Sequence, residues 1–294
     1  MICSRLRVEN MDCLKGEAAC LPFCVGAKMD FRKACIFVDG ENLRHSLCDL
    51  FTSAEFSPHD YLPKSAAWQG FFDHLVRQAN AAIRLRTYWY TVAEIDFWPY
   101  DIKRLLKPQE SENLLKVIRR NDEYRRLLDD NRTTQEQKLE QIGQELHQRQ
   151  EQMLARFGGW QKVQNGIAAN VESVEFRRAG SIRYDLMTRK LGNEKGVDVK
   201  LATDLLTLQS IYDVAIILSG DADYVPAVQA VKDCGKHVIN VSFLKKSGGV
   251  LPGGARRLNQ ATDRVLEIPH DVVSRYLLPQ AQQMEMTEHL TEDA

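Results

Sequence analysis

The residues of this chain with the clearest chemical potential are four aspartates beside short apolar runs: Asp39, Asp198, Asp221 and Asp223. Carboxylates brought close together repel one another, so a cluster of four is costly without cations. A hard divalent cation such as Mg²⁺ or Mn²⁺ relieves that repulsion and prefers oxygen ligands. A metal ion held in this way lowers the pKa of a bound water and would promote hydrolysis of a phosphate ester.

The apolar runs determine where these carboxylates would lie. Residues 35–38 and 214–218 form runs that stop at Asp39 and shortly before Asp221. Such runs are typical of buried parallel strands, and in open α/β sheets ligands bind beyond the carboxyl ends of the strands. Asp198 opens an amphipathic helix, where a carboxylate is also favoured. The alternative is that an aspartate near 221 simply caps the next helix, which accounts for one carboxylate but not for the recurrence.

Composition and charge indicate a cytoplasmic globular protein. The chain has 294 residues, of which 44% are hydrophobic, enough for a sizeable core. Its net charge of −1 argues weakly against non-specific nucleic-acid binding, although a cleft can be basic locally. The seven cysteines show no disulfide pattern, and Cys20 and Cys24 lack the second pair of a zinc finger. We expect no membrane partner, because no apolar run reaches membrane-spanning length and residues 1–30 lack a signal-peptide core.

The sequence pattern predicts one α/β domain interrupted by an insert. Residues 31–100 and 160–270 carry the strand and helix signals, whereas residues 101–159 are rich in Gln, Glu and Arg. We expect residues 1–30 to be an irregular extension and residues 271–294 to be a C-terminal tail. Strands are expected at 34–38, 85–92, 171–177, 214–218 and 237–243, helices from 42 onward and at 68–79, 198–208 and 224–234, and a last helix or strand at 258–268.

The insert is expected to be a helical hairpin with arms at Glu110–Leu128 and Thr134–Phe157, ended by Gly158 and Gly159. Its second arm has an apolar stripe near heptad spacing, formed by Leu139, Ile142, Leu146 and Met153. Such a stripe favours a solvated spacer or a coiled coil that pairs two copies of the chain as a homodimer. The alternative is a clamp for nucleic acid, which four arginines of the first arm favour: Arg119, Arg120, Arg125 and Arg126.

Several sequence blocks resemble the NYN-domain family, in particular its LabA-like (DUF88) branch. The blocks are Val38–Leu43, Lys195–Val199, Ala202–Asp204, Ser219–Tyr224, Gly235–Val238 and Leu258–Asp263. They occur in the family's order and cover roughly residues 34–100 and 170–268, broken by the insert. The family belongs to the PIN-like nucleases. The resemblance therefore implies a three-layer α/β/α sandwich with a mostly parallel central sheet, here carrying an inserted helical hairpin.

The resemblance also implies roles for individual residues. The family's catalytic, metal-binding aspartates fall on the four aspartates named above, with Mg²⁺ or Mn²⁺ as the cofactor. Asn42 matches the asparagine of the first block, and Asp204 matches a recurrent aspartate that helical spacing turns away from Asp198. We expect Asn42, Asp204 and Ser219 to support the ligands or the fold around them, since a serine hydroxyl can bind a carboxylate, a phosphate or a metal-bound water. Tyr224 stands where the family more usually has Phe.

Binding an RNA backbone would require cations beside the acidic residues. Eight basic residues precede Asp198 or flank the glycine-rich stretch after residue 247: Arg177, Arg178, Arg183, Lys195, Lys245, Lys246, Arg256 and Arg257. A solvated surface is the alternative for each group, because exposed lysines and arginines are common. Single-stranded RNA is the expected target, since Tyr184 and Trp160 could stack on bases, although Trp160 equally suits a core position.

These observations predict a Mg²⁺- or Mn²⁺-dependent endoribonuclease that hydrolyses phosphodiester bonds, and the resemblance implies 5′-phosphate and 3′-hydroxyl products. A second hypothesis is a non-catalytic RNA-binding or assembly module of the same fold, because a fold does not prove activity. A third is a HAD-like phosphatase, which would need an Asp-x-Asp pattern starting at Asp39 that Glu41 fits poorly.

Overall fold

The computed structural model describes residues 32–52, 55–56, 61–63, 66–98, 102, 111–129 and 134–278, all within one unit of the chain. The predicted N-terminal extension and the part of the predicted tail beyond residue 278 lie outside these residues. Within the described part of the chain, no helix is both long enough and apolar enough to cross a membrane.

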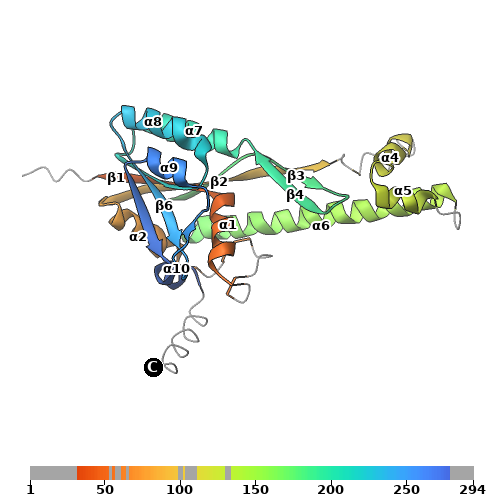
Figure 1. Cartoon of the computed structure of the whole chain (residues 1–294), viewed down its shortest axis with the longest axis horizontal. Helices are drawn as coiled ribbons and strands as arrows, with labels where there is room; N and C mark the ends of the chain where they lie inside the picture. The colour runs from red at the N-terminus through yellow and green to blue at the C-terminus, as the bar shows by residue number, and fades with distance from the viewer. Residues whose placement is uncertain are drawn as a thin grey trace, which may run out of the picture. The chain divides into compact units, whose positions relative to one another are not determined.

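A mostly parallel sheet forms the middle of the fold (Figure 1). The described strands are β1 (Lys33–Asp39), β2 (Ile83–Trp98), β3 (Val174–Asp185), β4 (Lys190–Lys195), β5 (Val214–Leu218), β6 (His237–Leu244), β7 (Val250–Leu251) and β8 (Arg264–Pro269). Their order is β4-β3-β2-β1-β5-β6-β7, and β8 also pairs with β6. The β3–β4 and β6–β7 pairs are antiparallel, and the others are parallel. Strand β1 therefore has a parallel neighbour on each side.

Helices cover both faces of the sheet. The described helices are α1 (Gly40–Leu50), α2 (Trp68–Gln78), α4 (Ser111–Ile118), α5 (Asp122–Asp129), α6 (Gln135–Asn170), α7 (Val197–Thr207), the 3₁₀ turn η2 (Ala222–Tyr224), α8 (Val225–Asp233), α9 (Arg256–Ala261) and α10 (His270–Leu277). Along β1, Ile36 and Val38 pack with α1, α2 and α10, while Cys35 and Phe37 pack with α7, α8 and α9. This alternation suits a strand buried on both faces. The layers and the mostly parallel sheet confirm the predicted fold class.

Most predicted strands and helices match the structure within a few residues, but the segments after β2 and after residue 269 differ. Strands β2 and β3 remain paired as far as Trp98 and Asp185, well beyond their predicted ends. The short strand β4 then pairs antiparallel with β3. It carries little apolar sequence, so its partner rather than its composition defines it. Helix α10 lies within the predicted tail and packs its apolar face on the sheet.

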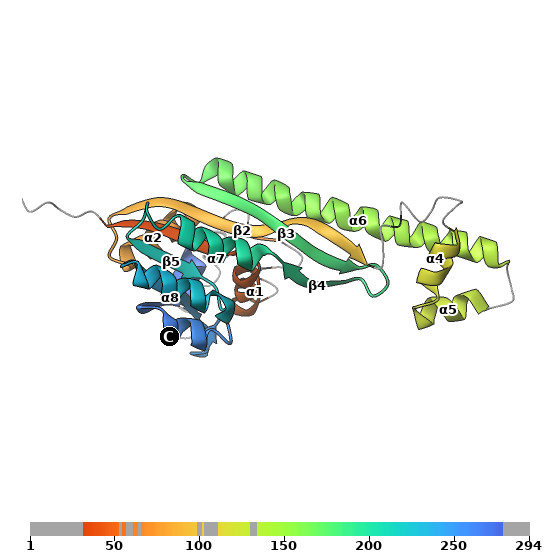
Figure 2. The same ribbon diagram turned by 90° about the horizontal axis from the view of Figure 1, so that it is seen from above.

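Helix α6 does not end at Gly158 and Gly159 as predicted, but continues to Asn170. A glycine inside a helix costs about 1 kcal/mol relative to alanine. Burial of Phe157 and Ile167 against the clusters on the two faces of the sheet offsets that cost. Figure 2 shows α6 alongside β3, which it contacts. The predicted domain boundary at residue 160 thus falls within one continuous helix.

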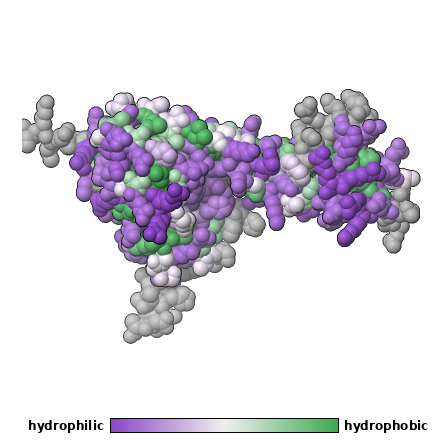
Figure 3. All heavy atoms as spheres, turned by 45° about the horizontal axis from the view of Figure 1, so that its top comes forward, coloured by the Kyte–Doolittle hydropathy of each residue, from purple (hydrophilic) through white to green (hydrophobic). Residues whose placement is uncertain are grey.

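The insert has a hydrophobic cluster of its own, which we call the distal cluster. Its buried residues are Ile102, Leu114, Val117, Ile118, Tyr124, Leu128, Ile142, Leu146, Leu186 and Met187. In place of the first predicted arm, two short helices, α4 and α5, pack on α6 and on the loop after β3. In the view of Figure 3 the surface is mainly hydrophilic, with hydrophobic side chains in scattered patches. Pairing of two copies through the insert, and clamping of nucleic acid by it, both stay predictions.

We expect Leu146→Ala to destabilise the distal cluster while the α/β domain stays folded. Leu146 is fully buried, and truncating such a leucine costs about 2–5 kcal/mol. The distal cluster shares no residue with the two clusters at the sheet. Amide hydrogen exchange should therefore accelerate in α4, α5 and the first half of α6 but not in β1 or β5. Leu154→Ala, at a position 38% exposed on the same helix, is the control. Lost protection across the whole sheet would contradict this independence.

Candidate active site

The carboxylate of Asp39 is the centre of the candidate site. Asp39 ends β1, is fully buried and caps α1. Its Oδ1 accepts the backbone N–H of Asn42 at 3.1 Å. Its Oδ2 accepts the Asn42 side-chain amide at 2.7 Å, the Ser219 hydroxyl at 2.9 Å and the Tyr224 hydroxyl at 3.1 Å. Burial raises the pKa of Asp39 to about 6 and the charge of Asp198 adds to this, although the hydrogen bonds oppose it.

The residues after Asp39 explain why α1 begins at once. A side chain on Gly40 would come within 2.5 Å of the Tyr90 carbonyl oxygen, so only glycine fits between β1 and β2. Asn42 lies one turn into the helix, where its amide reaches back to Asp39. Its side-chain oxygen accepts the backbone N–H of Gly220 at 3.3 Å. Asn42 therefore connects the ends of β1 and β5.

The turn after β5 brings Ser219, Asp221 and Asp223 to the same edge of the sheet. The Ser219 hydroxyl donates to Asp39 and accepts the backbone N–H of Asp221 at 3.1 Å. Asp221 in turn accepts the backbone N–H of Asp223 at 2.9 Å and so caps η2. The alternative explanation, that this aspartate caps the next helical turn, therefore holds for Asp221. It does not account for Asp223, whose side chain is exposed.

Asp198 belongs to α7, which packs on the face of the sheet opposite to α1. It lies in the first turn of α7, after Gly196, which has a φ of +89°. Its Oδ1 accepts the Tyr224 hydroxyl at 2.8 Å, and the same hydroxyl lies 3.1 Å from Asp39. Burial, followed by the charges of Asp221 and Asp223, raises the pKa of Asp198. Asp198 is therefore coupled electrostatically to Asp39, Asp221 and Asp223.

Glu194 is a further acid of this group that the sequence reasoning missed. It lies on β4, opposite Ile182 of β3. Burial raises its pKa to about 8, helped by the charges of Asp39, Glu41 and Asp198. Neighbouring Glu41 behaves oppositely: although burial opposes it, hydrogen bonds from His45 and Arg44 lower its pKa to about 2. No sequence signal separates Glu194 from the charged residues around it, because only the pairing of β4 with β3 turns it toward the site.

The acidic residues suit a hard divalent cation in chemistry but are not arranged around one point. Their donors are carboxylate oxygens, which Mg²⁺ and Mn²⁺ prefer. Burial and then the charges of neighbouring carboxylates raise the pKa of Asp198 and of Glu194, and a cation relieves this repulsion between the carboxylates. Among the described residues, however, no three Asp, Glu, His or Cys side chains stand close enough together to hold a metal ion. Binding by three of them would therefore require side-chain rotation.

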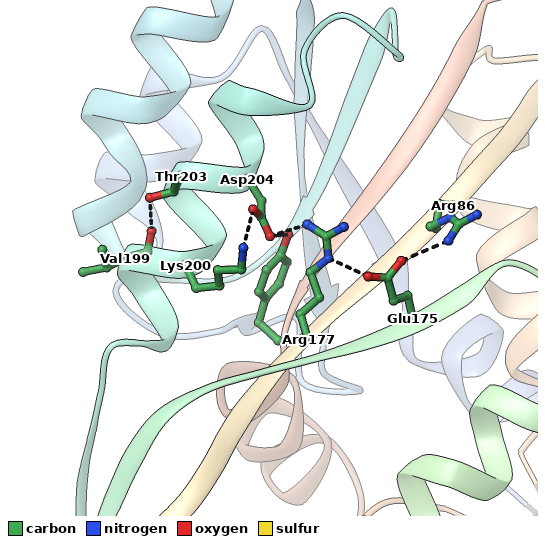
Figure 4. Close-up of polar contacts among 8 residues, drawn as sticks. Arg86, Glu175, Arg177, Val199, Lys200, Thr203 and Asp204 are labelled. Carbon is green, nitrogen blue, oxygen red and sulfur yellow. Dashed lines mark hydrogen bonds and ion pairs between the residues drawn. The ribbon is translucent and has the colours of Figure 1, made fainter.

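Asp204 lies away from these carboxylates in a separate network (Figure 4). Its carboxylate accepts the Tyr90 hydroxyl at 3.1 Å and the Lys200 ammonium at 2.8 Å, and it also pairs with Arg177. Arg177 further pairs with Glu175 at 2.9 Å. The ion pairs leave the pKa of Asp204 lowered, although burial opposes this. Asp204 therefore ties α7 to β2 and β3, through Tyr90 and Arg177.

The eight predicted RNA-binding cations differ in the side-chain contacts that they make within the described part of the chain. Arg177 is held as described, and Arg178 donates to Gln164 at 3.0 Å and to Asn165 at 2.8 Å, which ties β3 to α6. These two arginines therefore hold the fold together. Looser contacts involve Arg183, 3.9 Å from Asp96, and Lys246, 3.8 Å from Glu55. Four have neither an ion pair nor a side-chain hydrogen bond within the described part of the chain: Lys195, Lys245, Arg256 and Arg257.

Arg257 has the position best suited to a ligand beside the acidic residues. It lines an open hollow of about 440 Å³ together with Ala222, Asp223, Val225, Pro226 and Gln260. The hollow thus joins one candidate metal ligand to a free guanidinium and an amide. The two aromatic rings expected to stack on bases are engaged elsewhere. Trp160 stacks on Tyr61 at 5.2 Å, and Tyr184 packs edge-on against Phe97 at 6.2 Å.

Comparisons with known proteins add a family and two weak structural likenesses. The family model of the NYN domain matches residues 97–269, a range that includes Asp198, Asp221 and Asp223 but begins after Asp39. No curated protein matches the chain. A protein of unknown function from Vibrio parahaemolyticus is 15% identical and has a TM-score of 0.38, with 86% of this chain and 99% of that chain covered. The T5 5′-exonuclease with bound divalent zinc ions is 14% identical and has a TM-score of 0.31, with 74% and 57% covered.

In metal-free protein, we expect the pH dependence of stability to reveal Glu194. Its pKa is raised in the folded state from 4.5 to about 8, so the folded state holds this proton more tightly than the unfolded state does. The resulting stabilisation is complete below pH 4.5 and is lost as the pH rises through 8. Urea unfolding in EDTA should show this loss for the wild type and a smaller one for Glu194→Gln. Glu267→Gln, at an exposed position on β8, is the control. Identical pH profiles for the wild type and Glu194→Gln would refute the assignment.

Proposed function

This chain belongs to the NYN-domain family, and from that premise we propose that it is a Mg²⁺- or Mn²⁺-dependent endoribonuclease that hydrolyses phosphodiester bonds of single-stranded RNA. Family membership supports a nuclease. The observation that carries the proposal further is the buried Asp39 carboxylate, which Tyr224 connects to Asp198 at the carboxyl edge of the sheet. Ligands bind at this edge in open α/β sheets.

The residues that would hold the ion are Asp39, Asp198, Asp221 and Asp223, with Glu194 beside them. A bound divalent ion supplies a water of lowered pKa and neutralises charge that develops on the phosphoryl oxygens. Asn42 and Ser219 fix the orientation of Asp39, so that this ligand is held before any ion binds. Ser219 also holds the backbone of Asp221 and thereby positions the turn that carries the other two aspartates.

The hollow beside Asp223 is the proposed place for a nucleotide next to the scissile phosphate. Its guanidinium, from Arg257, suits a phosphate oxygen, and Gln260 offers an amide that can both donate and accept. The apolar side chains of Val225 and Pro226 complete its lining and suit the face of a base or sugar. The preference for RNA over DNA rests on the resemblance to the family, because the rings expected to stack on bases pack against other aromatic rings of the protein.

A non-catalytic RNA-binding or assembly module is the second candidate. The observation that favours it is the lack of three metal-binding side chains in one close group among the described residues. The HAD-like phosphatase loses support. It would need a second free acid two residues after Asp39, whereas Glu41 is paired with Arg44 at 2.5 Å and lies 3.2 Å from His45.

We expect labelled single-stranded RNA to be cleaved with Mg²⁺ or Mn²⁺ and to stay intact with EDTA. Asp39→Asn should lower the rate by about 100-fold or more, since even loss of a residue that only supports a metal ligand costs 10–100-fold. Asp233→Asn, an exposed aspartate near the end of α8, should cleave as the wild type does. Metal-independent cleavage, or full activity of Asp39→Asn, would sink the nuclease proposal. Binding of RNA without cleavage by the wild type would support the second candidate.

We expect Arg257→Ala to weaken RNA binding while Arg256→Ala has little effect. Both arginines are exposed neighbours on α9, but only Arg257 lines the hollow beside Asp223. Loss of one phosphate contact should lower the slope of log affinity against log salt by about one. Fluorescence anisotropy with a short labelled RNA between 50 and 200 mM salt, in Ca²⁺ to suppress turnover, would measure both slopes. Equal losses for the two variants would show general surface attraction instead.

A further inference from the structure

Among the residues that the structure describes, the Tyr224 hydroxyl is the one group that contacts candidate ligands from two different layers of the fold. It lies 2.8 Å from Oδ1 of Asp198, on α7, and 3.1 Å from Oδ2 of Asp39, at the end of β1. Tyr224 is fully buried, so no solvent molecule competes for this position from outside. A buried hydroxyl needs a hydrogen-bond partner, and here two carboxylates provide it.

The fold holds the ring of Tyr224 firmly. Tyr224 ends η2 and stands directly before α8, whose first turn contains Pro226. Its ring belongs to the same hydrophobic cluster as Val197 and Leu201 of α7. An aromatic side chain has only two rotatable bonds, so packing of the ring fixes the place of the hydroxyl. A side chain with a fixed ring therefore bridges α7 and the end of β1.

The two carboxylates depend on this hydroxyl to different degrees. Asp39 also accepts hydrogen bonds from Asn42 and Ser219, so its orientation survives without Tyr224. For Asp198 the Tyr224 hydroxyl is the one hydrogen-bond donor that the described residues supply. The charges of Asp221 and Asp223 repel Asp198 at the same time. Without the hydroxyl, nothing in the described part of the chain would direct the Asp198 carboxylate toward Asp39.

We propose that Tyr224 is a positioning residue for the divalent ion, whose hydroxyl directs Asp198 toward Asp39 so that both carboxylates can bind one ion. The inference rests on the proposed function, because it concerns the same site. A hydroxyl has one hydrogen, which can serve only one of the two carboxylates at a time. The contact with Asp198 is the shorter one, and Asp198 is the carboxylate with no other donor among the described residues, so Asp198 depends more on this hydrogen. The Tyr224 oxygen lies within 3.1 Å of both ligands, which holds the Asp198 carboxylate near Asp39.

The test compares Tyr224→Phe with Tyr212→Phe. Tyr212 is also buried, lies in the same hydrophobic cluster and donates its hydroxyl to the Leu205 carbonyl. Both variants lose one buried hydroxyl, but only Tyr224→Phe changes the acidic residues. Mn²⁺ affinity, measured by electron paramagnetic resonance on the full chain, should fall 10–100-fold in Tyr224→Phe and stay at the wild-type value in Tyr212→Phe. RNA cleavage at saturating Mn²⁺ gives a second measurement of the same variants.

A double-mutant cycle identifies the carboxylate through which Tyr224 acts. If the hydroxyl orients Asp198, adding Tyr224→Phe to Asp198→Asn should cause no further loss of Mn²⁺ affinity. A further full loss in the double mutant would overturn the proposal, as would unchanged or tighter Mn²⁺ binding by Tyr224→Phe alone. If Tyr224→Phe lowers the melting temperature in EDTA more than Tyr212→Phe does, the two variants are not matched in stability. The double-mutant cycle then decides whether Tyr224 acts through Asp198. A wild type that binds no Mn²⁺ at millimolar concentration would overturn the metal-dependent function itself, which distinguishes that failure from failure of the Tyr224 proposal.

Discussion

The burial of the Asp39 carboxylate is the constraint on which the rest of the site depends. An ionised carboxylate without water needs hydrogen bonds, a cation or a proton. Three segments meet this need: α1 provides Asn42, the turn after β5 provides Ser219, and the end of η2 provides Tyr224. Their hydrogen bonds do not cancel the cost of burial, because the pKa of Asp39 stays raised to about 6. The negative charge of Asp39, at the carboxyl edge of the sheet, is therefore not neutralised by the described residues.

Asp204 shows how the same fold treats a carboxylate that it uses for stability. Both Asp39 and Asp204 are buried, with 0% and 3% of their surface exposed. Arg177 and Lys200 neutralise Asp204 and lower its pKa, whereas hydrogen bonds from uncharged groups hold Asp39. Buried ion pairs are satisfied within the protein, and a buried acid without one is typical of functional sites. This difference separates a stabilising aspartate from one that is available to a ligand.

The sequence predicts the strand-end aspartates but not the charged groups that long-range pairing brings in. Asp39 and Asp221 follow apolar runs, and such runs identify buried strands without further knowledge. Glu194 reaches the site through the pairing of β4 with β3, which composition does not show. Arg177 and Arg178 look like free cations until their partners, distant in the sequence, are known. Likewise Gly158 and Gly159 predict a helix end, and only tertiary burial of Phe157 and Ile167 explains why α6 continues.

Because α6 is continuous, a single helix links the insert to the sheet. At 1.5 Å per residue, its 36 residues extend for about 54 Å. One end of this rod carries Ile142 and Leu146 of the distal cluster, and the other end is fastened to the sheet through Ile167 and through the amide of Gln164, which meets Arg178 and Tyr61. One continuous element therefore connects the distal cluster to β3 and, through strand pairing, to β4, the strand that carries Glu194.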